Sequence, residues 1–151
     1  MNPLFHSLVA EFAVSRNLPF SEDVIGLEFD CENVGVWVMP HPVDPDHALV
    51  ETTVTVMNPL QQALVAPYLL QVNESARFEH GWTIVMDPEG QVLVSRSLPL
   101  QGTTLAEFES ALAEGVDQAQ ALAQTIDLMA QMEAEGPSEA ASAAEATMVR
   151  V

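Results

Sequence analysis

The spacing of hydrophobic residues along the 151-residue chain predicts helices and strands in a definite order. Near the start, apolar side chains recur every three or four residues, as on the buried stripe of an amphipathic helix, and the Asn17-Leu18-Pro19 sequence would end that helix. The pattern then changes to alternation over residues 25–29, 34–39 and 48–57, which is typical of strands. We therefore expect one helix followed by three strands. The helical stripe consists of Phe5, Leu8, Val9, Phe12 and Ala13.

A second helix and a hairpin are predicted next. Pro59 suits the first turn of a helix in which apolar residues recur at every fourth position, and Pro67 is a candidate kink within it. Residues 82–94 alternate on both sides of the Asp87-Pro88-Glu89-Gly90 sequence, which has the composition of a tight turn. This segment is expected to be a hairpin of two strands. The stripe of the second helix is Leu60, Leu64 and Tyr68.

The remaining chain predicts a long helix and then a tail. Thr104 and Glu107 have the spacing of a capping box, and an apolar stripe continues from there to Ile126. Residues 133–151 are mostly Ala, Glu and Ser, with too little apolar bulk to offset the entropy of ordering, so we expect a disordered acidic tail after a domain of residues 1–132. The predicted fold class is α+β, with the order α-β-β-β-α-β-β-α and a twisted antiparallel sheet packed by helices.

The charge of the chain restricts its partners. Its 22 acidic residues face only four arginines and no lysine, which gives a formal net charge of -18. Nucleic acids and anionic membranes attract proteins through Lys and Arg, so neither is an expected partner, and no apolar stretch is long enough to span a bilayer. The N-terminus lacks the features of an export signal, and the single cysteine, Cys31, fits a reducing compartment. A cytoplasmic protein that binds neutral or basic partners is expected.

One loop contains residues that could support chemistry. His41, Asp44, Asp46 and His47 lie within seven residues and could ligate zinc or a similar ion. Prolines within the same loop also explain its polar composition through turn formation. A small metal-dependent enzyme that uses the His41–His47 loop is therefore one alternative, and an acidic inhibitor, such as an immunity protein against a basic toxin, is another. Cys31 lies between two acidic residues, which disfavour a reactive thiolate.

Three quoted segments, in their order along the chain, resemble a known family. They are "LLQVN" (69–73), "WTIVMDPEGQVLVSRSLPL" (82–100) and "LAEFESALAEGVDQAQAL" (105–122). Together with the order of elements and the acidity, they resemble the class I chaperones of bacterial type III secretion, the Tir chaperone family. The resemblance covers residues 1 to about 131 and leaves the tail outside.

The resemblance implies a homodimer in the bacterial cytoplasm. Such a dimer binds the N-terminal chaperone-binding region of a secreted effector in extended, non-globular form and keeps it soluble and competent for export. The export ATPase is a further candidate partner. The resemblance implies no enzymatic activity, no cofactor and no metal.

The resemblance also implies the positions of two binding surfaces. The second helix and the first strand of the second hairpin would form the dimer interface, while the first helix and the sheet would bind the effector. The implied effector-binding residues are Leu8, Phe12, Val36, Val38, Val50 and Val54. The implied dimer-interface residues are Leu60, Leu64, Tyr68, Trp82 and Ile84.

Overall fold

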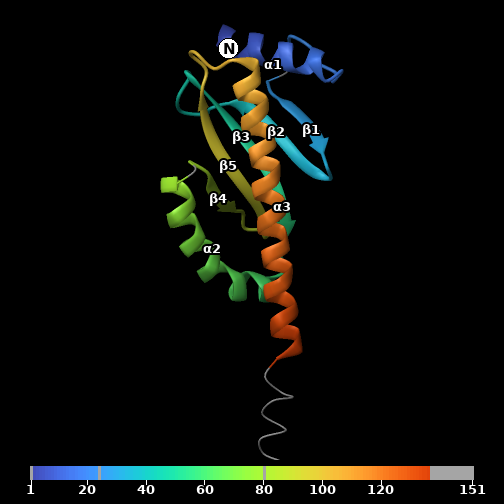
Figure 1. Cartoon of the computed structure of the whole chain (residues 1–151), viewed down its shortest axis with the longest axis vertical. Helices are drawn as coiled ribbons and strands as arrows, with labels where there is room; N and C mark the ends of the chain where they lie inside the picture. Colours follow the sequence, from blue (N-terminus) through green and yellow to red (C-terminus); the bar gives the residue numbers. More distant parts are fainter. Residues whose placement is uncertain (1, 24, 80, 137–151) are drawn as a thin grey trace, which may run out of the picture.

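The computed structural model describes residues 2–23, 25–79 and 81–136 (Figure 1). Its helices and strands follow the predicted order, which confirms the α+β fold class. The predicted tail falls mostly on residues 137–151, which lie outside the described residues. The elements are α1 (Pro3–Ser15), β1 (Leu27–Cys31), β2 (Val34–Pro40), β3 (His47–Val56), α2 (Pro59–Glu79), β4 (Thr83–Met86), β5 (Gln91–Pro99) and α3 (Leu105–Glu135).

The five strands form one antiparallel sheet in the order β1-β2-β3-β5-β4. Directly paired residues point to the same side of a sheet, so the register defines two faces. The inner face includes the pair Phe29 and Val36 and is packed against α3. The outer face carries the row Glu28, Trp37 and Glu51. Each strand therefore contributes alternately to the core and to the outer face.

Two tight turns connect the hairpins, and the second lies where its sequence predicts a turn. Glu32 and Asn33 both have positive φ (51° and 67°), the conformation of a type I′ turn that matches the twist of β1 and β2. Gly90 ends the β4–β5 turn with φ 88°, and a Cβ there would clash with the Met57 carbonyl oxygen. Asp87 closes this turn by accepting a hydrogen bond from the Gln91 N–H at 2.8 Å. Only glycine fits at position 90, because both the φ and the close contact exclude a side chain.

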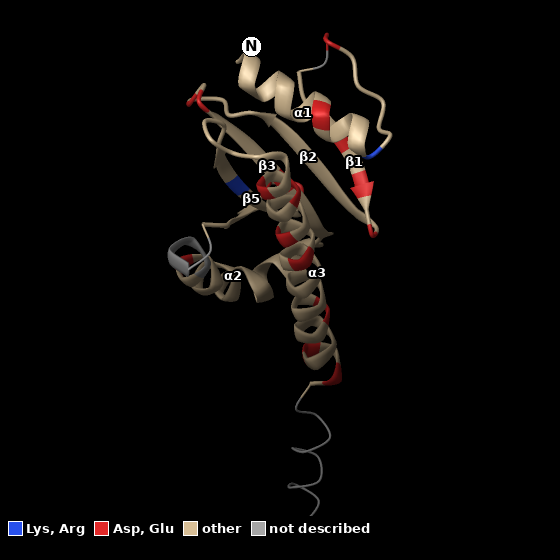
Figure 2. Ribbon diagram, turned by 45° about the horizontal axis from the view of Figure 1, so that its top comes forward, with Lys and Arg blue, Asp and Glu red and all other residues tan. Residues whose placement is uncertain are grey.

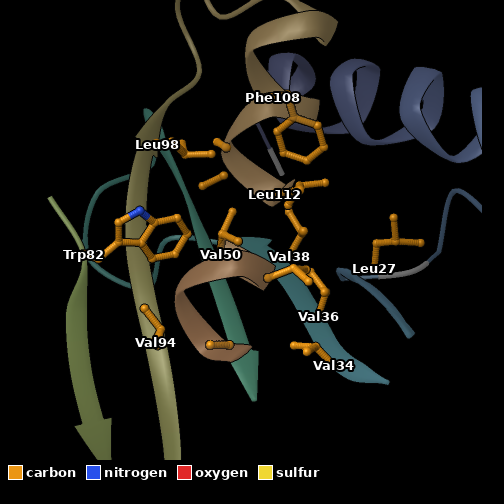
Figure 3. Close-up of a cluster of buried hydrophobic side chains, with 14 of the residues drawn as sticks. Leu27, Val34, Val36, Val38, Val50, Trp82, Val94, Leu98, Phe108 and Leu112 are labelled. Carbon is orange, nitrogen blue, oxygen red and sulfur yellow. The ribbon is translucent and has the colours of Figure 1, made fainter. Parts of the chain in front are cut away.

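The core lies between α3 and the inner face of the sheet (Figure 3). Phe108 and Leu112 project from α3 onto the valines of β2 and β3, and Trp82 fills the space beside β5. Gly115 allows Trp82 to approach the helix, since a Cβ at this position would lie 2.7 Å from the indole ring. Thr52 donates a hydrogen bond to the Gly115 carbonyl oxygen at 3.1 Å, which ties β3 to α3.

The first helix closes one end of this core. The centroid of the Phe12 ring lies 5.5 Å from that of Phe29 and 5.4 Å from that of Phe108. The elements α1, β1 and α3 therefore meet in one aromatic cluster. Asn2 caps the helix by accepting a hydrogen bond from the Leu4 N–H at 2.9 Å. At the other end, Asn17 adopts a positive φ of 53° and the helix stops, as the sequence predicts.

The capping box also starts α3 as predicted. Glu107 accepts a hydrogen bond from the Thr104 N–H at 2.8 Å, and its own N–H donates to the Thr104 hydroxyl at 3.3 Å. These bonds stabilise the carboxylate form and hold the pKa of Glu107 below its ordinary value. The helix then runs to Glu135, past the end of the sheet (Figure 1). Among the described residues, no helix is long and apolar enough to cross a membrane.

Candidate functional site

An apolar groove lies beside β1, between α1, β1 and α3. It has a volume of about 400 Å³, and its walls come from all three elements and from the loop after α1. We call it the β1 groove. The apolar residues that line it are Phe12, Leu18, Phe29, Val36, Leu112, Ala113 and Val116, and the polar ones are Arg16, Asp30, Cys31 and Glu109.

Charged side chains surround the apolar lining of the β1 groove. Arg16 pairs with Glu109 at 3.3 Å, and Ser15 donates to the same carboxylate at 3.4 Å, so α1 and α3 are joined across one wall. Asp30 borders the groove on the β1 side, while its carboxylate lies on the outer face of the sheet, near Gly35. Figure 2 shows further acidic residues over α1, β1 and the length of α3. A segment that enters the groove with apolar side chains therefore passes a mainly acidic surface.

The two edges of the sheet differ in what they offer to another chain. At the β4 edge, Asn73 of α2 donates to the Ile84 carbonyl oxygen at 3.3 Å and accepts from the Ile84 N–H at 2.8 Å. This side chain occupies the backbone groups that a new strand would need. The β1 edge has no further strand beside it in the described part of the chain. The β1 edge, next to the β1 groove, is therefore the better site for strand addition.

The structure places the six predicted effector-binding residues mostly in the core. Leu8, Val38 and Val50 are buried beneath the helices. Phe12 and Val36 are also buried, but they line the floor of the β1 groove. The sixth, Val54, is half-buried at a bulge between its neighbours in β3. An incoming chain in the β1 groove would therefore meet Phe12 and Val36, and the role of all six residues in binding stays a prediction.

The five predicted dimer-interface residues come from α2, from β4 and from the residue before β4, and we call this set the α2–β4 surface. Leu60 is 79% exposed, whereas Trp82 is buried in the core. The other three, Leu64, Tyr68 and Ile84, are half-buried. Their role in dimerisation stays a prediction. Two hollows accompany them: one of about 170 Å³ lined in part by Tyr68, Trp82 and Ile84, and one of about 290 Å³ lined by Ala66, Leu69, Leu70, Asn73, Ile84 and Met86.

Several residues of these surfaces were not singled out from the sequence. Phe29 and Leu112 line the β1 groove, and Leu70 is 71% exposed on α2 beside the predicted dimer residues. The alternation of β1 placed Phe29 on the same face as Leu27, so its inward position was readable. Phe29 is only half-buried, however, because its exposure depends on how far α1 extends over β1. The periodicity of the sequence does not encode this.

The His41–His47 loop uses its polar side chains within the loop itself. The Nδ1 atom of His41 accepts a hydrogen bond from the Asp44 N–H at 3.0 Å, and Asp44 accepts one from the Asp46 N–H at 3.0 Å. Asp44 also lies 2.8 Å from the Nδ1 atom of His47. Within residues 2–23, 25–79 and 81–136, no group of three or more potential ligands is arranged to hold a metal ion. The loop geometry gives no support to the metal-dependent enzyme alternative.

Solved structures share the arrangement described above. The crystal structure of the ExsC-ExsE complex matches with 23% identity and a TM-score of 0.62, over 83% of this chain and 96% of that chain. The ExoT-SpcS complex from Pseudomonas aeruginosa matches with 23% identity and a TM-score of 0.59, over 79% and 97%. The HopA1-SchA chaperone-effector complex matches with 12% identity and a TM-score of 0.66, over 82% and 95%. These matches show a shared fold.

Sequence comparison identifies the family. No curated protein matches the chain significantly in sequence. The family model described as Tir chaperone protein (CesT) family, however, matches residues 4–123, which include every element from α1 to the first half of α3. This range contains the β1 groove, the α2–β4 surface and all three segments that carry the resemblance. The chain belongs to the Tir chaperone protein (CesT) family.

Proposed function

We propose that this protein is a type III secretion chaperone that holds the N-terminal region of a secreted effector in extended form. The observation that carries the proposal is the β1 groove beside a sheet edge with which no described strand pairs, in a chain of the Tir chaperone family. The protein would act in the bacterial cytoplasm by binding alone, without a chemical step. Its acidity favours effectors with basic residues near the bound segment.

The groove and the edge support one mode of binding. An extended segment added to β1 gains main-chain hydrogen bonds, and every second side chain points toward the inner face, where the groove lies. The buried residues Phe12 and Val36 would form the floor beneath these side chains. A segment bound this way remains extended because its backbone is paired with the sheet. Such a segment is non-globular and available for export.

We also propose that two subunits associate through α2 and β4. Leu60 and Leu70 are large apolar residues that are 79% and 71% exposed, and Met86 is 39% exposed on the adjacent strand. Leu70 and Met86 line one hollow together with Asn73, whose hydrogen bonds hold α2 against β4, and Leu60 lies on the same helix. Exposed apolar surface of this kind is more stable when it is covered by a partner. A second copy of the chain would cover it.

A substitution that fills the β1 groove tests the proposed function. Ala113 is exposed on α3 and lines the groove, so Ala113→Trp obstructs it without altering the core. Ala106→Trp places the same side chain at an exposed position earlier on α3 and serves as the control. After co-expression with candidate effectors, we expect Ala113→Trp to reduce effector recovery about tenfold, equivalent to about 1.4 kcal/mol, and Ala106→Trp to leave it unchanged.

Limited proteolysis and mass spectrometry of the complex complete the test. An extended effector segment should be cleaved readily outside the region that the chaperone protects. Recovery of a folded, protease-resistant basic protein would instead support the acidic inhibitor. Equal effector recovery with both variants would contradict the assignment of the β1 groove as the binding site.

A further inference from the structure

The strand β1 contributes to two surfaces at once. Phe29 faces the β1 groove on the inner side, while Glu28 and Asp30 point to the outer face of the sheet. The three helices pack on the inner side or along the β4 edge (Figures 1 and 2). A strand added to β1 would therefore have one set of side chains in the groove and the intervening set on the outer face.

The outer face next to β1 is acidic and partly apolar. Glu28 lies directly opposite Trp37 in the register, and Glu51 lies opposite Trp37 on its other side, so the half-buried indole is flanked by two carboxylates. Asp30 lies opposite Gly35, which has no side chain to cover it. A shallow hollow of about 580 Å³ adjoins this row. Its lining includes Asp23, Ile25, Glu28, Trp37 and Met39.

This combination fits a basic side chain. A guanidinium or ammonium group can lie against an indole ring and pair with carboxylates beside it, while its aliphatic stem covers apolar surface. The two arginines whose side chains are described, Arg16 and Arg96, pair with Glu109 and Glu114 instead. A second copy of the chain is disfavoured as the occupant, since two outer faces would bring their carboxylates together.

We propose that the bound effector segment has two distinct faces: apolar side chains that enter the β1 groove alternate with arginine or lysine side chains that lie on the outer face. The basic side chains would pair with Glu28 and Asp30 and extend toward Trp37. This inference rests on the proposed function and adds to it the sequence pattern that the site selects. The pattern follows from the alternation of side chains along a strand and from the opposite character of the two sides of β1.

Two synthetic peptides test the pattern. Both contain ten residues that alternate valine with a second residue, which is arginine in one peptide and citrulline, its neutral isostere, in the other. We expect the arginine peptide to bind about tenfold more tightly by calorimetry at low salt, and to shift the NMR signal of the Trp37 indole N–H. Equal affinities for the two peptides would overturn the inference.

Matched variants separate this site from general attraction to an acidic protein. The double variant Glu28→Gln/Asp30→Asn should lose the preference for arginine. The control Glu11→Gln/Asp117→Asn removes the same charge from exposed positions on α1 and α3 and should keep it. Equal losses in both double variants, or a change of oligomeric state in Glu28→Gln/Asp30→Asn alone, would also overturn the inference.

The citrulline peptide and the Ala113→Trp variant together test the groove independently of the basic side chains. Binding of the citrulline peptide that Ala113→Trp abolishes supports the β1 groove whatever the arginine peptide does. If effector recovery depends on Ala113 but the two peptides bind alike, the proposed function stands and only the alternating pattern fails. If Ala113→Trp changes neither effector recovery nor peptide binding, the groove itself is not the site.

Discussion

At the scale of single residues, Gly115 decides how closely α3 approaches the sheet. A methyl group there would lie 2.7 Å from the Trp82 ring and 3.1 Å from the Thr52 side chain, both of which are buried. Alanine favours a helix over glycine by about 1 kcal/mol, whereas overpacking a core costs about 1–3 kcal/mol. The difference between these two effects leads us to expect that Gly115→Ala lowers the free energy of unfolding by about 1 kcal/mol in urea denaturation.

A double-mutant cycle identifies the cause of that loss. In a Trp82→Phe background the ring is smaller, so the added methyl group has more room and Gly115→Ala should cost less than it does beside tryptophan. If the two substitutions were additive, the contact between Gly115 and Trp82 would not be the source of the effect.

The sequence predicted which residues lie on the apolar face of the sheet, but not which of them another chain can reach. Val36 and Val50 were expected on the sheet and lie there, yet both are buried. Alternation shows which side of a strand is apolar, but not whether a helix covers it. The exposed part of Phe29 depends on the position of α1, which is set by packing among Phe12, Phe29 and Phe108.

At the scale of elements, one side chain joins α2 to the sheet. Asn73 forms two hydrogen bonds with the backbone of Ile84, at 2.8 and 3.3 Å. We expect Asn73→Ala to cost about 1 kcal/mol and to accelerate hydrogen exchange of the Ile84 amide, because that N–H loses its acceptor at a sheet edge. Gln71→Ala, an exposed change on the same helix, should alter neither measurement. Unchanged exchange at Ile84 would show that Asn73 does not hold the edge.

The order of the elements was predictable because each has a strong local signal. The capping box at Thr104, the turn ending at Gly90 and the helix end at Asn17 all appear where the sequence indicates. Contacts between elements were harder to predict from the sequence. The sequence showed Asn73 only as part of a family resemblance, since its partner in β4 is 11 residues away and is paired through backbone atoms.

At the scale of the whole molecule, the exposed apolar residues of α2 predict a dimer. Leu60 and Leu70 project into solvent from a single subunit. Replacing both with aspartate places charges in the proposed interface, where their desolvation would be unfavourable. By sedimentation, we expect the native chain to be dimeric and the Leu60→Asp/Leu70→Asp variant to be monomeric with an unchanged fold by circular dichroism.

A matched variant distinguishes this interface from a general effect of added charge. Val14 and Leu128 are also exposed apolar residues, on α1 and α3, and Val14→Asp/Leu128→Asp adds the same two charges away from α2. This control should remain dimeric. Since the β1 groove and the α2–β4 surface are built from different elements, a monomeric variant should still bind a segment that occupies one groove. Loss of peptide binding together with the dimer would show instead that the groove requires both subunits.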